Sequence, residues 1–379
     1  MVRTRKLLGG EMIDALRDGL DSLLGRGRYS AAVPVMDGPL QPNQGLDGAE
    51  TIVAAPGLDN VVAVGDLLYF SSHSALIKLG TDGVQEGVMQ FDSEVTCLAT
   101  DGHAALAIGL DGGGIAIRGG PFDGQVIQAL GDTPFICPTD AAFLNENTLL
   151  VASGSARFPA SEWKRDLMTR GHSGSVWKMD LASGSQQIVA KELSYPFGLV
   201  PLENGDLLVS EAWRHRLIRI GQSSSTRSKP VLEDLPGYPA RICRAAHGGY
   251  WLTIFAPRNQ LVEFILGERG YCDAMVSTVD PAYWIAPALA SGVSFKETLQ
   301  YGAVKRMGIL KPWAPTWSYG LVVLLGSDFI PVASWHSRAD GTRHGITCVS
   351  EYCGRIVVGA KGSGEALVLN TSNVFEELG

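Results

Sequence analysis

The sequence predicts an all-β fold, a six-bladed β-propeller with an N-terminal helix and a partly helical cap insertion. From Glu50 onward, short apolar or β-branched runs are separated by Gly, Asp and Asn, which is typical of short strands joined by tight turns. The runs also repeat as a unit of one apolar strand, a turn, and a second strand that ends in small or polar residues. Six such units along one chain favour a closed propeller over a sandwich.

Each unit opens with the strand that we expect to line the central channel. These inner strands are expected to begin near Asp59, Glu94, Thr139, Phe197, Ala240 and His344. The run ETIVAA, residues 50–55, precedes the first unit and has no partner within it. Because ring closure removes exposed strand edges, we expect this run to form the outer strand of the last blade.

Three segments lie outside the repeat. Residues 1–45 contain apolar residues at helical spacing between Met12 and Leu24, followed by a Pro- and Gly-rich linker, so we expect a helix and linker before a propeller over residues 46–379. Residues 154–172 and 257–317 are too long for simple turns, and residues 295–310 within the second read as a helix. Long insertions in compact folds often form lids, so we expect both to cap one face of the channel.

Composition excludes several classes of function. The net charge of −8 argues against a nucleic-acid partner, because no basic surface is available to bind phosphates. No apolar run is long enough to span a bilayer and no signal-peptide pattern is present, so no membrane partner is expected. The six cysteines are scattered without close-spaced pairs, which predicts buried core thiols in a cytoplasmic protein. The oligomeric state is left open.

Catalytic motifs of other enzyme classes are also absent from the sequence. It contains no G-x-S-x-G elbow, H-E-x-x-H helix, P-loop or dinucleotide-binding fingerprint. Serine-hydrolase, zinc-protease, kinase and dehydrogenase chemistry therefore lose support, and no cofactor is expected.

Residues 235–259, LPGYPARICRAAHGGYWLTIFAPRN, resemble the signature of strictosidine-synthase-like proteins. Residues 195–220 look like the preceding blade of that family, and residues 311–325 and 346–360 look like its C-terminal end. The similarity covers residues 46–369. It implies a six-bladed propeller related to gluconolactonase-type and paraoxonase-type hydrolases.

The chain departs from this family at positions that carry its chemistry. Plant strictosidine synthases use a glutamate where this chain has Thr347 or a near neighbour, and a hydroxyl does not supply that acid–base chemistry. Related lactonases hold a divalent cation with an acidic residue, two asparagines and an aspartate. Here Asp59 fills the acidic position, but the other three are Thr139, Phe197 and Ala240, so neither genuine strictosidine synthase activity nor a catalytic calcium is expected.

The residues that open the inner strands are the candidate site. We expect Asp140 or His344 to activate water, Arg241 to stabilise an oxyanion or pair with an acid, and Asp59 to complete the catalytic group. The alternative is that the aspartates only cap turns. Candidate substrate-binding residues are Asn60, Glu94, Thr139, Trp163, Arg165, Phe197, Glu211, Trp213, His215 and Thr347.

The run SEAWRHRLIRI allows two interpretations. On a strand, Glu211, Trp213 and His215 would share one face and could form a polar network near the channel. Alternatively, Glu211 belongs to a buried structural network with Arg214 or Arg216.

The sequence thus predicts a metal-independent hydrolase that acts on a lactone or ester of a small metabolite at the top of the channel. A strictosidine-synthase-like lyase or carbon–nitrogen bond-forming enzyme is one alternative. A propeller that binds a small molecule without catalysis is another.

Overall fold

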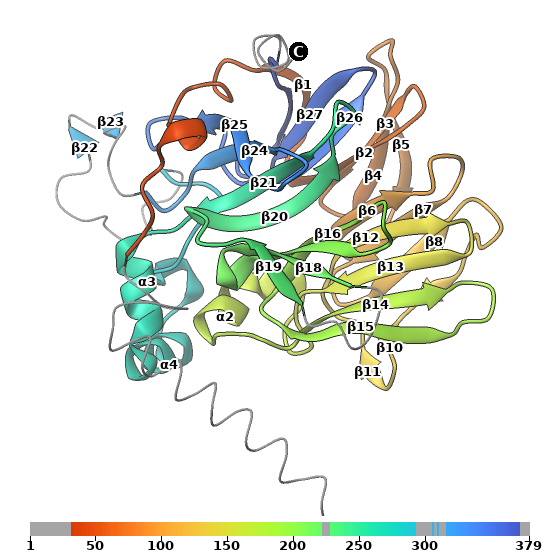
Figure 1. The fold of residues 1–379 in the computed structure, drawn as a ribbon, viewed down its shortest axis with the longest axis horizontal. Coiled ribbons are helices and arrows are strands. Elements are labelled where there is room, and N and C mark those ends of the chain that lie inside the picture. Colours follow the sequence, from red (N-terminus) through yellow and green to blue (C-terminus); the bar gives the residue numbers. More distant parts are fainter. Residues whose placement is uncertain (1–31, 222–227, 293–304, 307–308, 311–315, 372–379) are drawn as a thin grey trace, which may run out of the picture.

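The computed structural model describes residues 32–221, 228–292, 305–306, 309–310 and 316–371. Six four-stranded antiparallel sheets form the body of the molecule (Figure 1). The inner strands β2, β6, β12, β16, β20 and β26 each contact the next one, and β26 contacts β2. The sheets therefore close into the expected six-bladed propeller. The expected helix between Met12 and Leu24 lies outside the described residues.

The first three blades include a short ribbon between blades 2 and 3 and the first insertion within blade 3. Blade 1 contains β2 (Leu58–Val64), β3 (Leu67–Ser72), β4 (Ala75–Leu79) and β5 (Gln85–Gln90). Blade 2 contains β6 (Val95–Thr100), β7 (Leu106–Leu110), β8 (Gly114–Arg118) and β9 (Val126–Ile127). The ribbon of β10 (Ala129–Leu130) and β11 (Thr133–Pro134) follows. Blade 3 contains β12 (Pro138–Asn145), β13 (Thr148–Ser153), β14 (Gly174–Asp180) and β15 (Gln186–Leu193).

The last three blades include the larger insertion and the closing strand. Blade 4 contains β16 (Pro196–Pro201), β17 (Leu207–Glu211), β18 (Arg216–Ile220) and β19 (Lys229–Leu232). Blade 5 contains β20 (Gly237–Arg244), β21 (Tyr250–Pro257), β24 (Gly320–Leu325) and β25 (Pro331–Ser337). Blade 6 contains β26 (Ile346–Tyr352), β27 (Arg355–Ala360), β28 (Glu365–Val368) and β1 (Glu50–Ala54).

Ring closure uses the N-terminal strand, as the sequence predicts. Strand β1 pairs antiparallel with β28, with Glu50 opposite Val368 and Ala54 opposite Glu365. The last sheet thus combines strands from the two ends of the propeller. Strand β1 covers the edge that β28 would otherwise leave unpaired.

Apolar side chains fill each of the six gaps between neighbouring blades. The gap between blades 6 and 1, for example, holds Val53, Phe70 and Val357, all at most 2% exposed. Cys97, Cys137, Cys272 and Cys348 are buried in the core, as expected of free thiols. The expectation fails for Cys353, which is exposed, because it lies in the β26–β27 turn with a φ of 49°.

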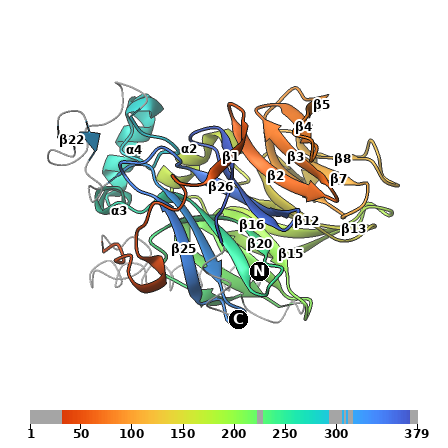
Figure 2. The ribbon, with the colours of Figure 1, turned by 90° about the horizontal axis from the view of Figure 1, so that it is seen from above.

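Both insertions form helices on one side of the ring (Figures 1 and 2). The first contains η2 (Ala160–Glu162) and α2 (Trp163–Met168), and the second contains α3 (Gln260–Gly267), α4 (Arg269–Thr278) and η4 (Pro281–Tyr283). None of the helices in the described ranges is long and apolar enough to cross a lipid bilayer.

The helix expected over residues 295–310 is wrong where the structure describes that segment. Strands β22 (Lys305–Arg306) and β23 (Ile309–Leu310) pair with each other there, and residues 295–304 and 307–308 lie outside the described residues. Gly302 and Gly308 lower the helix propensity of this stretch, which apolar spacing alone does not reveal.

The closing strand provides a test of the ring. Val53 is 2% exposed in β1, whereas Ala54 on the same strand is exposed. We expect Val53→Asp to lower the free energy of unfolding by about 3 kcal/mol, because it buries a carboxylate between blades 6 and 1. Urea unfolding of this variant beside Ala54→Asp measures the difference. Equal stability of the two variants would contradict closure through β1.

Candidate functional site at the channel mouth

Every inner strand is irregular close to its first residue. The antiparallel register of each inner strand with the second strand of its blade shifts there, in all six blades. The residues skipped by the pairing are Asp59 and Asn60, Thr96, Thr139, Phe197 and Gly198, Ala240 and Arg241, and Thr347. A bulge re-aims backbone and side-chain groups, and here each bulge lies where the inner strands converge.

Arg241 connects the bulges across the channel. Its guanidinium donates hydrogen bonds to the carbonyl oxygens of Asp59 at 3.3 Å, Thr139 at 3.1 Å and Thr347 at 3.2 Å, and to that of Thr96. These acceptors belong to blades 1, 3, 6 and 2, while Arg241 itself belongs to blade 5. One buried cation therefore satisfies backbone oxygens from four other blades.

A glycine allows the neighbouring blade to approach this cation. A Cβ atom added to Gly198 in β16 would lie 2.5 Å from the carbonyl oxygen of Ala240, closer than real contacts permit. Beside it, the ring of Phe197 lies under the guanidinium, 5.1 Å from the Arg241 Cζ atom. Blade 4 thus contributes an aromatic face to the same site.

Asp59 is a carboxylate held by two cations. Its side chain lies 3.3 Å from Arg241 and 2.8 Å from the Nζ atom of Lys361. Burial by itself would raise the pKa of Asp59, but the charges of Lys361 and Arg241 outweigh burial and hold the pKa below its usual value. Asp59 is therefore ionised at neutral pH.

Asp140 lies on the other side of the guanidinium and behaves differently. Its Oδ2 atom accepts a hydrogen bond from the backbone N–H of Leu199 at 2.8 Å, and its Oδ1 atom lies 4.0 Å from the Nε atom of Arg241. Burial raises the pKa of Asp140 to about 7, and the charge of Arg241 opposes this only in part. The same cation is thus flanked by one ionised carboxylate and one that titrates near neutrality.

The cap supplies an apolar roof on one side of this group. Trp163 of α2 and Phe197 of β16 each pack against the ring of Phe255, with ring centroids 5.3 and 5.2 Å apart. Ala288 and Leu289 of the second insertion join the same apolar cluster. Leu289 also lies close to Gly345, just before β26 of blade 6. A Cβ atom added to Gly345 would lie 2.8 Å from the Leu289 carbonyl oxygen, so the glycine allows this close approach.

Several predicted site residues are also close to this group. Thr139 donates its hydroxyl to the carbonyl of Pro196 at 2.6 Å, and Thr347 donates its hydroxyl to the carbonyl of Asp59 at 2.9 Å. Asn60 donates to Ser71 and to the carbonyl of Val95. These three residues join neighbouring blades through hydrogen bonds.

Other predicted residues have different surroundings. His344 lies two residues before β26, and its ring nitrogens lie 2.7 Å from the Ser318 hydroxyl and 2.8 Å from the carbonyl oxygen of Arg338. Burial lowers the pKa of His344. Glu94 is exposed and pairs with His73 at 3.2 Å.

Arg165 also lies outside the group around Arg241. It pairs with Glu162 at 2.7 Å and lies over the ring of Trp284 within the cap. Both of these contacts lie within the insertions and not on the inner strands.

The strand face expected for Glu211, Trp213 and His215 is wrong. Strand β17 ends at Glu211, a 3-10 turn η3 (Ala212–Arg214) follows, and His215 adopts a left-handed φ of 49° before β18 begins. This turn breaks the alternation on which the shared face depended. Glu211 instead pairs with Arg216 at 2.6 Å. This agrees with the second interpretation of the run, in which Glu211 belongs to a buried structural network with an arginine.

The other two residues of that run contact the cap insertions. Trp213 donates its indole N–H to Asp166 of α2 at 2.7 Å, and His215 lies 3.6 Å from Glu263 of α3. Tyr238 also donates to Glu263, and burial raises the pKa of Glu263 to about 7. These buried polar contacts attach the cap to blades 4 and 5.

Lys361 was not predicted from the sequence. It lies in the turn between β27 and β28, outside any inner strand, yet its amine contacts Asp59 and 29% of its side chain remains exposed. The sequence did offer one signal for it. Lys361 directly follows the apolar run RIVVGA, at the end of a strand that faces the mouth.

A metal site of the lactonase kind does not fit these residues. In the described part of the chain, no three His, Cys, Asp or Glu side chains gather closely enough to hold a metal ion. The carbonyl oxygens on the axis already accept hydrogen bonds from Arg241. A metal ion that used these oxygens would have to displace the guanidinium.

Comparison with known proteins shows the fold and distant relatives. No protein-family model matches the chain. Adipocyte plasma membrane-associated protein from Bos taurus is 24% identical over 277 residues, which cover 64% of this chain and 66% of that protein. The protein of the same name from Danio rerio is 23% identical over 265 residues, covering 67% and 58%. The chain thus matches just under two thirds of the bovine relative and less of the fish one.

Solved structures with this architecture include lactonases. A putative gluconolactonase has a TM-score of 0.52 at 12% identity over 85% of this chain and 91% of its own. A gluconolactonase from Xanthomonas campestris gives 0.53 at 12% over 84% and 88%, and the calcium-binding protein regucalcin from Agrobacterium tumefaciens gives 0.53 at 10% over 85% and 93%. The chain is therefore a six-bladed β-propeller of the gluconolactonase and regucalcin type in its fold.

The central guanidinium can be tested by substitution. We expect Arg241→Met to lower the free energy of unfolding by about 3 to 5 kcal/mol, because it leaves several buried carbonyls without this donor and removes one of the two cations beside Asp59. Arg244→Met on the same strand is the control, since the Arg244 side chain is 43% exposed. Urea unfolding measures both. An equally small loss in both variants would show that the hydrogen bonds on the axis contribute little.

Proposed function

We propose that the protein is a strictosidine-synthase-like hydrolase that cleaves a lactone or ester of a small metabolite at the channel mouth without a metal ion. One observation carries the proposal: Asp59 and Asp140 flank the same fixed cation, yet their pKa values are shifted in opposite directions. Carboxylates with separated pKa values are a common basis for acid–base catalysis. The lactonase names among proteins of the same fold support the reaction class.

Asp140 is the proposed general base. With a pKa near 7 it can accept a proton from water at neutral pH and return it to a leaving oxygen. Water would attack the carbonyl carbon while Asp140 takes its proton, and the C–O bond would then break as that proton passes to the alcohol oxygen. The half-buried Phe197 and Trp163 would cover an apolar part of the substrate.

Lys361 is the proposed stabiliser of the oxyanion, in place of Arg241. All three nitrogens of the Arg241 guanidinium already donate within the protein. Lys361 is partly exposed and contacts Asp59, and an ammonium has three N–H donors. Asp59 would hold the Lys361 amine at the mouth, where it can also donate to the developing charge.

A non-catalytic binding propeller is the second candidate. Asp140 accepts backbone hydrogen bonds at both of its carboxylate oxygens. These internal partners favour a structural role for Asp140, and so a site that binds without catalysis. The lyase alternative has less support, because Thr347 donates its hydroxyl to a backbone carbonyl and provides no acid.

The base can be tested by one substitution and a pH profile. We expect Asp140→Asn to lower kcat for lactone or aryl-ester hydrolysis at least ~100-fold. Its Tm at pH 8 should be unchanged or higher, because burial penalises the ionised carboxylate in the folded state. In the wild type, activity should rise as the pH increases through about 7, where Asp140 loses its proton.

The control for this experiment is Glu146→Gln, an exposed acid in a turn of the same blade. Full activity of Asp140→Asn would refute the role of Asp140. Binding of the substrate panel without turnover by the wild type would establish the binding alternative.

Metal independence has its own test. We expect hydrolysis to persist in excess EDTA, because the central carbonyl oxygens are bonded to Arg241. Activity is compared before chelation, after chelation and after addition of calcium. Loss on chelation with recovery on calcium would show that a metal takes part.

A further inference from the structure

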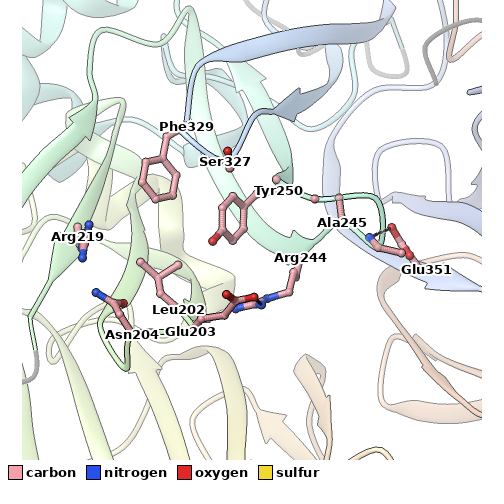
Figure 3. Close-up of a pocket in the computed structure, with 13 residues that line it drawn as sticks. Leu202, Glu203, Asn204, Arg219, Arg244, Ala245, Tyr250, Ser327, Phe329 and Glu351 are labelled. Atoms are coloured by element: carbon pink, nitrogen blue, oxygen red, sulfur yellow. Dashed lines mark hydrogen bonds and ion pairs between the residues drawn. The ribbon is translucent and has the colours of Figure 1, made fainter. Parts of the chain in front are cut away.

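A hollow of about 620 Å³, whose lining is drawn in Figure 3, opens at the ends of the strands that point away from the cap. It is lined by residues of the β16–β17, β20–β21 and β24–β25 turns and adjoining strands in blades 4 and 5, and by Glu351 of β26 in blade 6. Strand β16 begins at Pro196 beside the mouth and ends at Pro201, next to the lining residue Leu202. The hollow is thus separate from the site around Arg241, and its volume is typical of small-molecule sites.

One side of the hollow is aromatic. The rings of Tyr250 and Phe329 stack with centroids 5.4 Å apart and planes 24° apart, and Leu202 lies in the same lining. Phe329 has a φ of 68°, a left-handed backbone conformation that is unusual for a residue with a bulky side chain. Residues in such conformations are enriched at functional sites. Within the described ranges, the Tyr250 hydroxyl has no hydrogen-bond partner.

Two arginines that are already charge-balanced also line the hollow. Arg219 pairs with Asp206 at 2.6 Å, and Arg244 pairs with Glu203 at 2.7 Å. Arg244 also donates to the carbonyl oxygen of Pro201 at 3.2 Å. Both arginine side chains remain 43% exposed, so their remaining N–H groups can reach a ligand.

We propose that this hollow binds a neutral carbohydrate. A sugar ring has an apolar C–H face that packs on an aromatic ring, and hydroxyl groups that both donate and accept hydrogen bonds. Tyr250 and Phe329 provide the first surface, and the Arg–carboxylate pairs provide donors beside acceptors. An anionic ligand would gain less binding free energy from these arginines, because a carboxylate already neutralises each guanidinium.

A wholly apolar ligand fits less well for a different reason. It would cover the partly exposed guanidinium groups without offering acceptors to their remaining N–H groups. The combination of an aromatic surface with balanced polar pairs therefore favours a ring that carries several hydroxyl groups.

Saturation-transfer NMR on the full chain tests the proposal with maltose, cellobiose and lactose as probes, and with inorganic phosphate as a competitor. We expect transfer to at least one sugar, and no displacement by phosphate. Tyr250→Ala should weaken sugar binding at least ten-fold, whereas Tyr250→Phe, which keeps the ring, should bind within about three-fold of the wild type. Asp140→Asn should bind sugar normally, because its site is at the other face.

Arg219→Met serves as a second variant if Tyr250→Ala is unstable, since Arg219 is partly exposed, and it too should weaken binding. Absence of transfer to all three sugars would overturn the proposal. Displacement of a bound sugar by phosphate would show an anion site instead. Sugar binding that survives both Tyr250→Ala and Arg219→Met would place the sugar elsewhere.

Discussion

The hydrogen bonds of the Arg241 guanidinium hold the centre of the propeller together. The bulge in each inner strand turns backbone carbonyls out of the sheet, and buried carbonyls need donors. One planar cation with five N–H groups meets this need for blades 1, 2, 3 and 6 at once. Since these carbonyls belong to separate sheets, the guanidinium also fixes how the blades meet.

The same cation determines the acid–base character of the mouth. It lies closer to Asp59 than to Asp140, at 3.3 Å against 4.0 Å, and Lys361 adds a second positive charge only beside Asp59. Two equally buried aspartates therefore differ in pKa because of their distances to positive charge. Burial is the largest cause of the raised pKa of Asp140, and no second cation offsets it there.

The fold and part of the site could be predicted because both follow from the repeat. Asp59, Asp140 and Arg241 open inner strands, and strand openings converge in a closed ring. His344 precedes its strand by two residues and bonds to Ser318 instead, a shift too small to read from sequence. The turn at Ala212–Arg214 reversed the expectation for His215. Lys361 and much of the lining of the opposite hollow, such as Leu202 and Phe329, come from turns, whose spatial neighbours the repeat does not specify.

Strand β20 links the two faces of the molecule. Arg241, near its start, lies in the channel, and Arg244, at its end, lines the opposite hollow. Both arginines bond to backbone carbonyls of other strands, Arg241 across the ring and Arg244 to Pro201 of β16. A shift of either arginine would break these hydrogen bonds. The two faces therefore share one strand while differing in chemistry, with a buried charged group at the mouth on one side and an open hollow with an aromatic lining on the other.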